Sequence, residues 1–357
     1  MTEEIKIYGK DRNLKEIAKK DSTIFACVIS TTETSQIPNL TGAGMTTELT
    51  KYTPAVDVEA ILTGKTLSLP EIAMTDADEL AAPTPGLLTA TMMSLLDVPF
   101  ITINAGSEIK PQVPYIELNG IPGKDIRTGK AVENPETILK NAKETGKQLS
   151  KTTKHIMIGE STPAGTTTAQ GVLTALGYNV EGKISGSMKT NPHQLKKEIV
   201  DSGLKNAGYK AGDLKEDPLK AVGILGDPTI IATAGLVLGS SVPVTLAGGT
   251  QMAAVCAVIK ALEPDYNFDN IQIATTSYVV EDETSNLLEI VDQIGEITVY
   301  ATNPQLEKSK TKGLQNYAKG SGKEGVGAGG SVLLSYYNGV TTEKFLDTID
   351  EICSHLF

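Results

Sequence analysis

One carboxylate stands inside a dense run of glycines near the C-terminus. Residues 320–328 read GSGKEGVGA, so Glu324 is followed by Gly325 and Gly327, and the apolar run 332–334 comes soon afterwards. A carboxylate near a helix start can accept a proton as a general base, and glycines let the backbone approach a ligand closely. A plain surface loop would also be rich in glycine, but it would rarely continue directly into an apolar helix. We therefore predict a functional loop around Glu324.

A second segment places small hydroxyl residues between a predicted strand and a predicted helix. Residues 159–169 read GESTPAGTTTA, with a second carboxylate at Glu160, and they follow the apolar run 155–158. Hydroxyl and N–H groups at a helix N-terminus hydrogen-bond phosphate oxygens, and the helix dipole adds a favourable field. The candidate phosphate ligands here are Gly159, Ser161, Thr166 and Thr167. Capping of the helix by either threonine explains the same pattern.

Two further turns follow predicted strands. Gly248 and Gly249 connect the strand 242–246 to a helix, and Asn104 opens an Asn-Ala-Gly turn after the strand 100–103. Ligands of open parallel sheets bind at the carboxyl ends of the strands, so we expect these three residues to contribute to binding. A tight turn with close packing of helix on sheet explains the two glycines equally well.

Other familiar sequence motifs are incomplete or lack the neighbouring elements that their function requires. Residues 325–330 match GxGxxG, but a Gly- and Lys-rich stretch precedes them instead of a strand. Residues 63–66 read TGKT like the end of a P-loop, yet Glu59 occupies the position of the required first glycine. The three histidines are scattered and the three cysteines form no CxxC pair. We therefore predict no metal, no cofactor and no disulfide framework.

Charge and hydropathy limit the partners. The 357 residues carry a formal net charge of −11, which disfavours nucleic acid and anionic membrane surfaces as partners. Residues 228–259 contain no charged residue, but GSSVP and AGG interrupt them, so we predict a buried helix, strand and helix there and no membrane span. The N-terminus is polar and lacks a signal-peptide pattern. We expect a cytoplasmic protein.

Short apolar runs alternate with helical patterns along the chain, which predicts a mostly parallel sheet. The predicted strands are Ile24–Ile29, Phe100–Ile103, His155–Ile158, Val242–Leu246, Ile271–Thr275 and Ile297–Tyr300. The predicted helices are Thr168–Leu176, His193–Leu204, Thr229–Leu238, Gln251–Leu262, Thr284–Ile294 and Thr342–His355. Residues 110–132, rich in proline and glycine, are expected to form an extended surface loop.

In their order and spacing, these segments resemble the nicotinate-nucleotide:dimethylbenzimidazole phosphoribosyltransferase family, which makes the lower-ligand nucleotide of cobalamin. The resemblance runs from about Phe100 to Tyr337. Residues 159–167 are similar to the family's Gly-Glu…Thr-Thr motif and 324–328 to its Glu-Gly-x-Gly-Ala signature. Three further parts of the chain resemble segments of the family. Residues 126–129 are similar to its Ile-Arg-x-Gly loop and 104–106 to its Asp-Ala-Gly turn. Residues 217–219 and 236–258 are similar to its buried helix, strand and glycine-containing turn.

The chain also departs from that family. Residues 31–44 replace its early Asp-His-Gly segment, and Ala247 stands where the family has Asp. Gly165 replaces an Asn, and a His is missing from 274–280. These differences predict a divergent member.

The resemblance implies a three-layer α/β/α fold with a mostly parallel Rossmann-like sheet. It implies one phosphoribosyltransferase-like domain over residues 1–357 and a homodimer. Within that domain, residues 1–99 and part of the C-terminal helices are expected to form a smaller subdomain.

The resemblance further implies transfer of phosphoribosyl from nicotinate mononucleotide to a benzimidazole-type base, with release of nicotinate. The nicotinate leaves as a neutral ring nitrogen and needs no general acid, whereas the incoming base must lose its N–H proton, and Glu324 is the candidate for accepting it. Glu160 would stabilise the oxocarbenium-like sugar electrostatically. The expected substrate-binding residues are Gly159, Ser161, Thr166, Thr167, Gly248, Gly249, Gly325, Gly327 and Asn104.

Two alternatives remain open. The acceptor could be a different base, such as another benzimidazole, a purine or a phenol, because the early family segment is missing. The protein could also bind a nucleotide on the same fold without catalysis. Retention of Glu324 within its glycines favours catalysis.

Overall fold

A single mixed sheet organises the computed structural model, which describes residues 4–69, 74 and 81–356. Within these residues the sheet has eight strands in the order β1-β8-β7-β6-β5-β2-β3-β4. The strands are β1 (Ile5–Tyr8), β2 (Thr23–Ser30), β3 (Phe100–Gly106), β4 (Tyr115–Glu117), β5 (His155–Ser161), β6 (Val244–Ala247), β7 (Ile271–Thr276) and β8 (Thr298–Thr302). All neighbouring strands are parallel except β1, which pairs antiparallel with β8 at one edge.

The strand order reverses between β2 and β5. The chain builds outward from β2 through β3 to β4, then returns to place β5 on the other side of β2 and continues outward to β8. The carboxyl ends of β2 and β5 therefore diverge into loops on opposite sides, which is the arrangement that opens a ligand crevice in doubly wound sheets.

Six strands lie where the apolar runs predicted them, and the α/β class is confirmed. The predictions missed the two edge strands. β1 is only four residues long, and β4 falls inside the proline-rich segment 110–132. The expectation of an uninterrupted loop there is wrong, because Tyr115–Glu117 pairs with β3 and extends the sheet.

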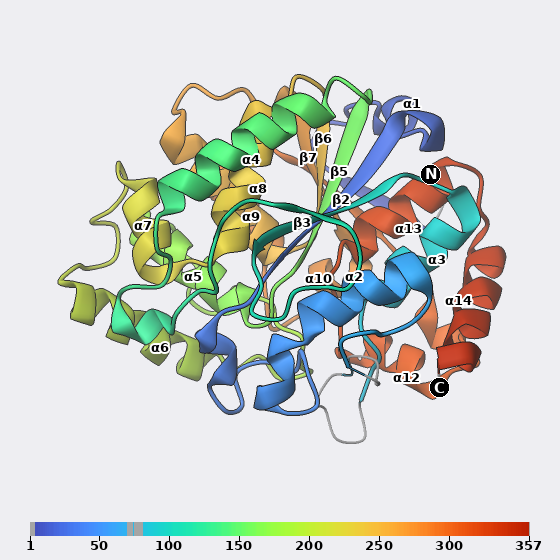
Figure 1. Ribbon diagram of the computed structural model, residues 1–357, viewed down its shortest axis with the longest axis horizontal. Coiled ribbons are helices and arrows are strands. Elements are labelled where there is room, and N and C mark those ends of the chain that lie inside the picture. Colours follow the sequence, from blue (N-terminus) through green and yellow to red (C-terminus); the bar gives the residue numbers. More distant parts are fainter. Residues whose placement is uncertain (1–3, 70–73, 75–80, 357) are drawn as a thin grey trace.

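Helices cover both faces of the sheet (Figure 1). α4 and α8 pack together on one face, with α8 against β2 and β3, whereas α13 lies on the other face against β6, β7 and β8 and contacts α3. The helices are α1 (Leu14–Ile17), α2 (Thr53–Thr63), α3 (Gly86–Leu96), α4 (Pro135–Leu149), α5 (Gly165–Ala175), α6 (His193–Ala207), α7 (Pro218–Leu225), α8 (Pro228–Gly239), α9 (Thr250–Leu262), α10 (Ser277–Val280), α11 (Leu287–Ile294), α12 (Lys312–Gln315), α13 (Ala328–Tyr337) and α14 (Thr342–Leu356). The three-layer architecture expected from the resemblance is confirmed.

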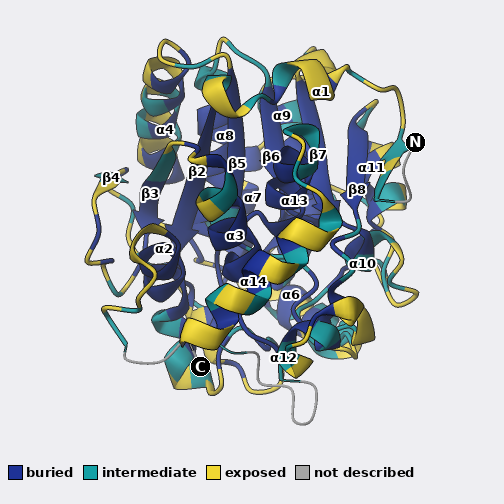
Figure 2. Ribbon diagram, turned by 90° about the vertical axis from the view of Figure 1, so that its right-hand side faces the viewer, coloured by how far each residue is buried: buried dark blue, intermediate teal, exposed yellow. Residues whose placement is uncertain are grey.

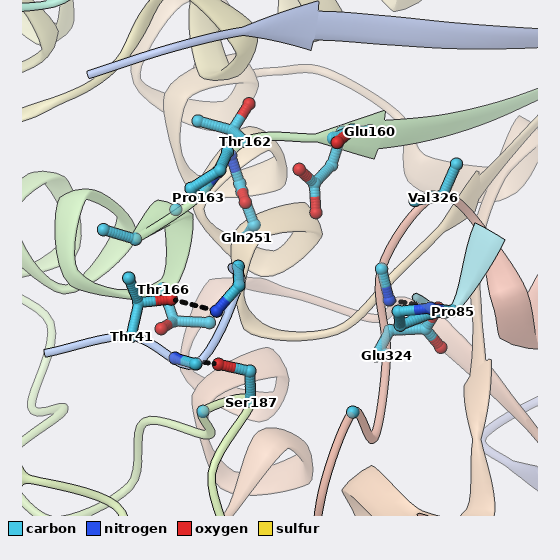
Figure 3. A pocket seen from close by; sticks show the side chains of 18 of the residues that line it. Thr41, Pro85, Glu160, Thr162, Pro163, Thr166, Ser187, Gln251, Glu324 and Val326 are labelled. Atoms are coloured by element: carbon cyan, nitrogen blue, oxygen red, sulfur yellow. Dashed lines mark hydrogen bonds between the residues drawn. The ribbon is translucent and has the colours of Figure 1, made fainter. Parts of the chain in front are cut away.

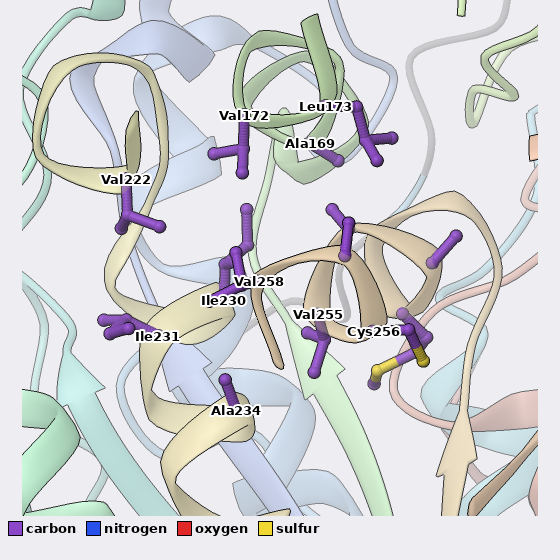
Figure 4. Close-up of a cluster of buried hydrophobic side chains, with 14 of the residues drawn as sticks. Ala169, Val172, Leu173, Val222, Ile230, Ile231, Ala234, Val255, Cys256 and Val258 are labelled. Atoms are coloured by element: carbon purple, nitrogen blue, oxygen red, sulfur yellow. The ribbon is translucent and has the colours of Figure 1, made fainter. Parts of the chain in front are cut away.

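The uncharged stretch 228–259 forms the buried helix, strand and helix that its interruptions predicted. α8 and α9 are buried on nearly all sides, and Figure 4 shows Ile230 and Ile231 of α8 facing the same apolar cluster as Val255 and Val258 of α9. Two apolar helices packed on a sheet explain this composition. Within the described residues, no helix is both long and apolar enough to cross one.

The six predicted helices are present, with α11 starting three residues later than expected because Asn286 caps it. α2 and α3 were missed, since burial on all sides removes the polar face that marks a helical period. α3 packs with the C-terminal helices α13 and α14, shown in Figure 2 on the face turned to the viewer. The smaller subdomain stays a prediction, and β2 from the same first hundred residues lies within the central sheet.

Candidate functional site

A cavity lies at the carboxyl ends of β5 and β6, next to the reversal of strand order. Its lining comes from the turns after both strands (160–166 and 249–251), the loop 185–187, and residues of the glycine-rich loop (322 and 324–326). The remaining wall comes from Val279 and from the first hundred residues, namely Thr41–Ala43, Thr53, Asp57, Met74, Thr84 and Pro85. The cavity thus gathers chain segments far apart in sequence. In Figure 3, Glu160 points into the space between Thr166 on one side and Glu324 on the other.

Glu324 lies in the loop just before α13, which begins at Ala328, and so is near a helix start, as its glycine frame predicted. Its carboxylate accepts hydrogen bonds from the Thr275 hydroxyl and from the N–H groups of Thr276, Gly325 and Gly329, at 3.0 to 3.2 Å. Burial raises the pKa of Glu324 to about 7, although these N–H groups favour the ionised form. A carboxyl group poised near neutral pH in a cavity is suited to accept a proton from a ligand.

The loop that carries Glu324 is clamped onto β5. The N–H of Val326 donates to the Glu160 carbonyl at 2.7 Å, and Val326 adopts φ 54°, a left-handed conformation that is strained for a β-branched residue. A Cβ on Gly159 would lie 2.9 Å from the Gly327 backbone, and one on Gly327 would lie 2.6 Å from Phe25. These two glycines allow the loop to lie directly on the strand, and this contact sets the height of Glu324 above the sheet.

Glu160 is the second carboxylate of the cavity. Burial raises its pKa well above the ordinary value, and the neighbouring charges of Asp227, Glu324 and Asp57 raise it further. These effects favour the protonated form of the Glu160 carboxyl group in the site without a ligand. A positively charged ligand beside it would favour the ionised form, so Glu160 can respond to a developing cation.

The side of the cavity opposite Glu324 combines hydroxyl groups, two helix N-termini and a buried lysine. The turns before α5 and α9 border it, and neither helix has a side-chain cap on its first turn, so capping by Thr166 or Thr167 is not observed. Lys196 donates from Nζ to the Thr166 hydroxyl at 3.1 Å and to the Ser185 carbonyl at 2.8 Å. N–H groups, a hydroxyl and a cation together suit an anionic phosphate.

Lys196 is 1% exposed, and no carboxylate among the described residues forms an ion pair with it. Burial, followed by the positive charge of Lys323, lowers its pKa to about 7. An anion bound next to Thr166 would supply the missing counter-charge and raise that pKa. This buried cation therefore makes this side of the cavity, the anion side, suited to a negatively charged group.

Two contacts connect the anion side to the Glu324 loop. The N–H of Gly322 donates to the Ser187 carbonyl at 2.9 Å. Lys323, which is adjacent to Glu324, forms a buried ion pair with Asp282 at 2.6 Å, and Asp282 also accepts from the Asn191 amide. The loop that carries the carboxylate and the loop that borders the anion side are thus held by one network.

Of the predicted site residues, the structure brings six to the cavity: Glu324, Glu160, Ser161, Thr166, Gly249 and Gly325. Ser161 borders the cavity, but its hydroxyl donates to Asp57.

The other five predicted residues do not border the cavity. They are Gly159, Thr167, Gly248, Gly327 and Asn104. Asn104 instead donates to Glu117 and accepts from the N–H groups of Gly106 and Ser107, so it shapes the turn after β3. Thr167 is fully buried on α5.

Sequence reasoning missed Asp57, Lys196, Gln251 and the loop 185–187. Lys196 lies on the predicted helix 193–204 next to Lys197, so nothing in the pattern singled it out. Asp57 stands between two valines on α2, a helix that the predictions did not contain. A charged residue between two valines was the available signal for Asp57. Among the described residues, no group of His, Cys, Asp and Glu is arranged to hold a metal ion.

Comparison with solved structures defines the class of fold. A nicotinate-nucleotide-dimethylbenzimidazole phosphoribosyltransferase from Thermus thermophilus superposes with a TM-score of 0.61 and 13% identity, over 94% of this chain and 89% of that one. A CobT structure from the same organism gives a TM-score of 0.59 and 14% identity, over 94% and 90%. This chain has the fold of these phosphoribosyltransferases.

Sequence comparison then gives the family. A UPF0284 protein of Methanothermobacter thermautotrophicus is 49% identical over 354 residues, covering 99% of this chain and 98% of that protein. A UPF0284 protein of Methanosarcina mazei is 45% identical over 341 residues, covering 95% and 96%. No family model matches the chain. The chain belongs to the UPF0284 family.

Proposed function

We propose that this protein transfers a phosphoribosyl group from nicotinate mononucleotide to a benzimidazole-type base and releases nicotinate. The observation that carries the proposal is Glu324, a carboxyl group with a pKa of about 7 that borders a cavity whose opposite side suits a phosphate. The likeness in fold to phosphoribosyltransferases supports the same class of reaction.

The nucleotide would bind with its 5′-phosphate beside Thr166, the loop 185–187 and the first turns of α5 and α9. Lys196 would contribute its charge from behind Thr166, to which it donates a hydrogen bond. This placement directs the ribose across the cavity toward Glu160 and leaves the wall of Pro85 and Val326, next to Glu324, for the acceptor base. Positioning of two reactants in one site is itself a large source of rate increase.

The chemistry needs one base and no acid. One ring nitrogen of the acceptor attacks C1′ while the C1′–N bond to nicotinate breaks, and its electron pair stays on the nicotinate ring nitrogen. The other ring nitrogen of the acceptor gives its proton to Glu324. Glu160, ionised by the adjacent positive charge, would stabilise the oxocarbenium-like sugar between the two bonds.

The test is nicotinate release from nicotinate mononucleotide, followed by chromatography across a panel of benzimidazoles, purines and phenols. The proposal predicts release that depends on the acceptor and a ribotide product of matching mass. Nucleotide binding, seen as a thermal shift, without release for any acceptor would instead favour the non-catalytic binding protein. The expected homodimer and the cytoplasmic location stay predictions, and sedimentation of the purified protein would decide the first.

A further inference from the structure

Gln251 borders the cavity from the first turn of α9, and its amide group has a hydrogen-bond partner at one end only. The residue is 4% exposed. Its Nε2 donates to Oδ2 of Asp227 at 3.2 Å, whereas no donor among the described residues is hydrogen-bonded to its Oε1. Figure 3 shows Gln251 between Pro163 and Thr166. A nearly buried acceptor atom without a partner thus lies at the cavity wall.

Asp227, the N-cap of α8, fixes the orientation of this amide. Its Oδ1 accepts from the N–H groups of Thr229 and Ile230 at 2.9 and 3.1 Å, and its Oδ2 also accepts from the Thr168 hydroxyl at 2.5 Å. Burial raises the pKa of Asp227 to about 6, so at about pH 8 the carboxylate is ionised and can only accept hydrogen bonds. Gln251 must therefore turn its NH2 group toward Asp227, which leaves the amide oxygen free for a ligand.

Glycine at position 165 makes room for the amide. Gly165 is the first residue of α5 and borders the cavity. A Cβ there would lie 2.0 Å from Oε1 and 2.8 Å from Nε2 of Gln251. The amide therefore occupies the space that a side chain at 165 would fill. Because Oε1 is the nearer atom, the acceptor end of the amide lies beside the first turn of α5, next to the place proposed for the phosphate.

Nicotinate mononucleotide has few groups that can donate to such an acceptor. Its phosphate and its ring carboxylate are ionised at about pH 8, and its ring nitrogen is bonded to the sugar. The 2′- and 3′-hydroxyls of the ribose are therefore its only hydrogen-bond donors. Because one carbon separates the ribose ring from the phosphate oxygen, a phosphate beside α5 brings the sugar close to Gln251.

We propose that Gln251 determines the specificity for the sugar by accepting a hydrogen bond from a ribose hydroxyl on its Oε1, and that Asp227 is the positioning residue that orients the amide. This inference rests on the proposed function and adds the part of the nucleotide that the site distinguishes. An analogue without that hydroxyl leaves a nearly buried amide oxygen unpaired. Sites built to bond a substrate hydroxyl reject analogues that lack it strongly.

The test measures by calorimetry, at about pH 8 and without an acceptor base, the affinities for nicotinate mononucleotide and for its 2′-deoxy and 3′-deoxy analogues. In the wild type, at least one deoxy analogue should bind about 10- to 100-fold more weakly than the parent nucleotide. Gln251→Met keeps the length of the side chain and removes the amide oxygen. It should weaken binding of the parent nucleotide to the level of that analogue and leave the affinity for the analogue unchanged, so the ratio of the two affinities falls close to one.

Two further variants separate this role from a structural one. Gly165→Ala fits the helical backbone and displaces the amide while Gln251 itself is unchanged, so the affinity ratio should fall in this variant as well. Gln170→Met is the matched control, because Gln170 is a buried glutamine on α5 that does not border the cavity. Its Oε1 also has no hydrogen-bond partner among the described residues. The control should keep the wild-type ratio.

A wild-type ratio below about two for both deoxy analogues, or an unchanged ratio in Gln251→Met, overturns the inference. Release of nicotinate with an acceptor base would then leave the proposed function standing. The wild-type ratios need no variant, so they test the inference even if Gln251→Met does not fold. Absence of nicotinate release with every acceptor contradicts the proposed function, and the affinity ratio still decides this inference because it is measured without an acceptor. Absence of nucleotide binding overturns both.

Discussion

The two ends of β5 bury polar groups in opposite ways. At the amino end, His155 is fully buried, and its ring nitrogens bond the hydroxyls of Thr23 and Thr245 at 3.0 and 2.8 Å. Burial lowers the pKa of His155 to about 3, so the ring stays neutral. At the carboxyl end, Glu160 and Glu324 face a cavity and have raised pKa values. At the amino end, both ring nitrogens of His155 have partners within the protein, whereas at the carboxyl end the two carboxyl groups border the cavity.

This difference separates stability from function. Neutral groups that pair with each other cost little to bury, whereas buried ionisable groups without full partners destabilise a fold. The carboxyl end also contains Val326 in a left-handed conformation, and such strain clusters at functional sites. Substitutions at the two ends should therefore affect different measurements.

The largest expected effect is on turnover at the carboxyl end. Glu324→Gln keeps the shape of the side chain and removes the proton acceptor, so nicotinate release should fall by about 10² to 10⁴-fold. Nucleotide affinity, measured by calorimetry, should stay within about threefold of the wild type. Unchanged turnover would show that Glu324 is not the proton acceptor.

The next effect is a pH dependence of kcat/KM with two limbs. Glu324 must be ionised, so activity should rise with pH up to its pKa of about 7. Lys196 must be protonated to attract phosphate, so activity should fall as pH rises above its own pKa of about 7. Each limb should approach tenfold per pH unit away from the maximum. A profile that is flat between pH 5 and 9 would contradict both assignments.

A smaller effect should follow from Lys196→Met. Loss of a charge-assisted contact of about 1.5 to 3 kcal/mol should weaken binding of nicotinate mononucleotide by about 10- to 100-fold. The same substitution should leave the folded protein at least as stable in urea, because it replaces a buried cation that has no paired carboxylate. A variant that binds normally but unfolds more easily would assign Lys196 a structural role.

A substitution at the amino end of β5 should have the smallest effect on function and the clearest effect on stability. His155→Gln should lower the free energy of unfolding at pH 7 by about 1 to 3 kcal/mol, because a buried hydroxyl loses its partner. Because the folded pKa of His155 lies below the unfolded value, its contribution is complete above pH 6.5 and is lost as pH falls toward 3. The variant should show a flatter decline over that range and normal nucleotide affinity. Weakened nucleotide binding would mean that the two ends are coupled.

The same contrast explains what could be predicted from the sequence. The two strands that flank β5, β2 and β6, are buried along their whole length, so their positions followed from short apolar runs, and glycines with hydroxyl residues after the strands indicated the site. Gly159 and Gly327 were assigned to a ligand because a sequence cannot distinguish close approach to a ligand from close approach of two backbones. Asp57 and Lys196 enter the site only through packing between distant segments, which local patterns do not encode.

We propose that the phosphate of a bound nucleotide and the carboxylate of Glu324 occupy opposite sides of one cavity. A crystal structure of the complex with nicotinate mononucleotide tests it most directly. We expect the phosphate to lie within hydrogen-bonding distance of Thr166 and the loop 185–187, with the ribose directed toward Glu160. A phosphate beside Glu324, or a nucleotide bound outside the cavity, would contradict it.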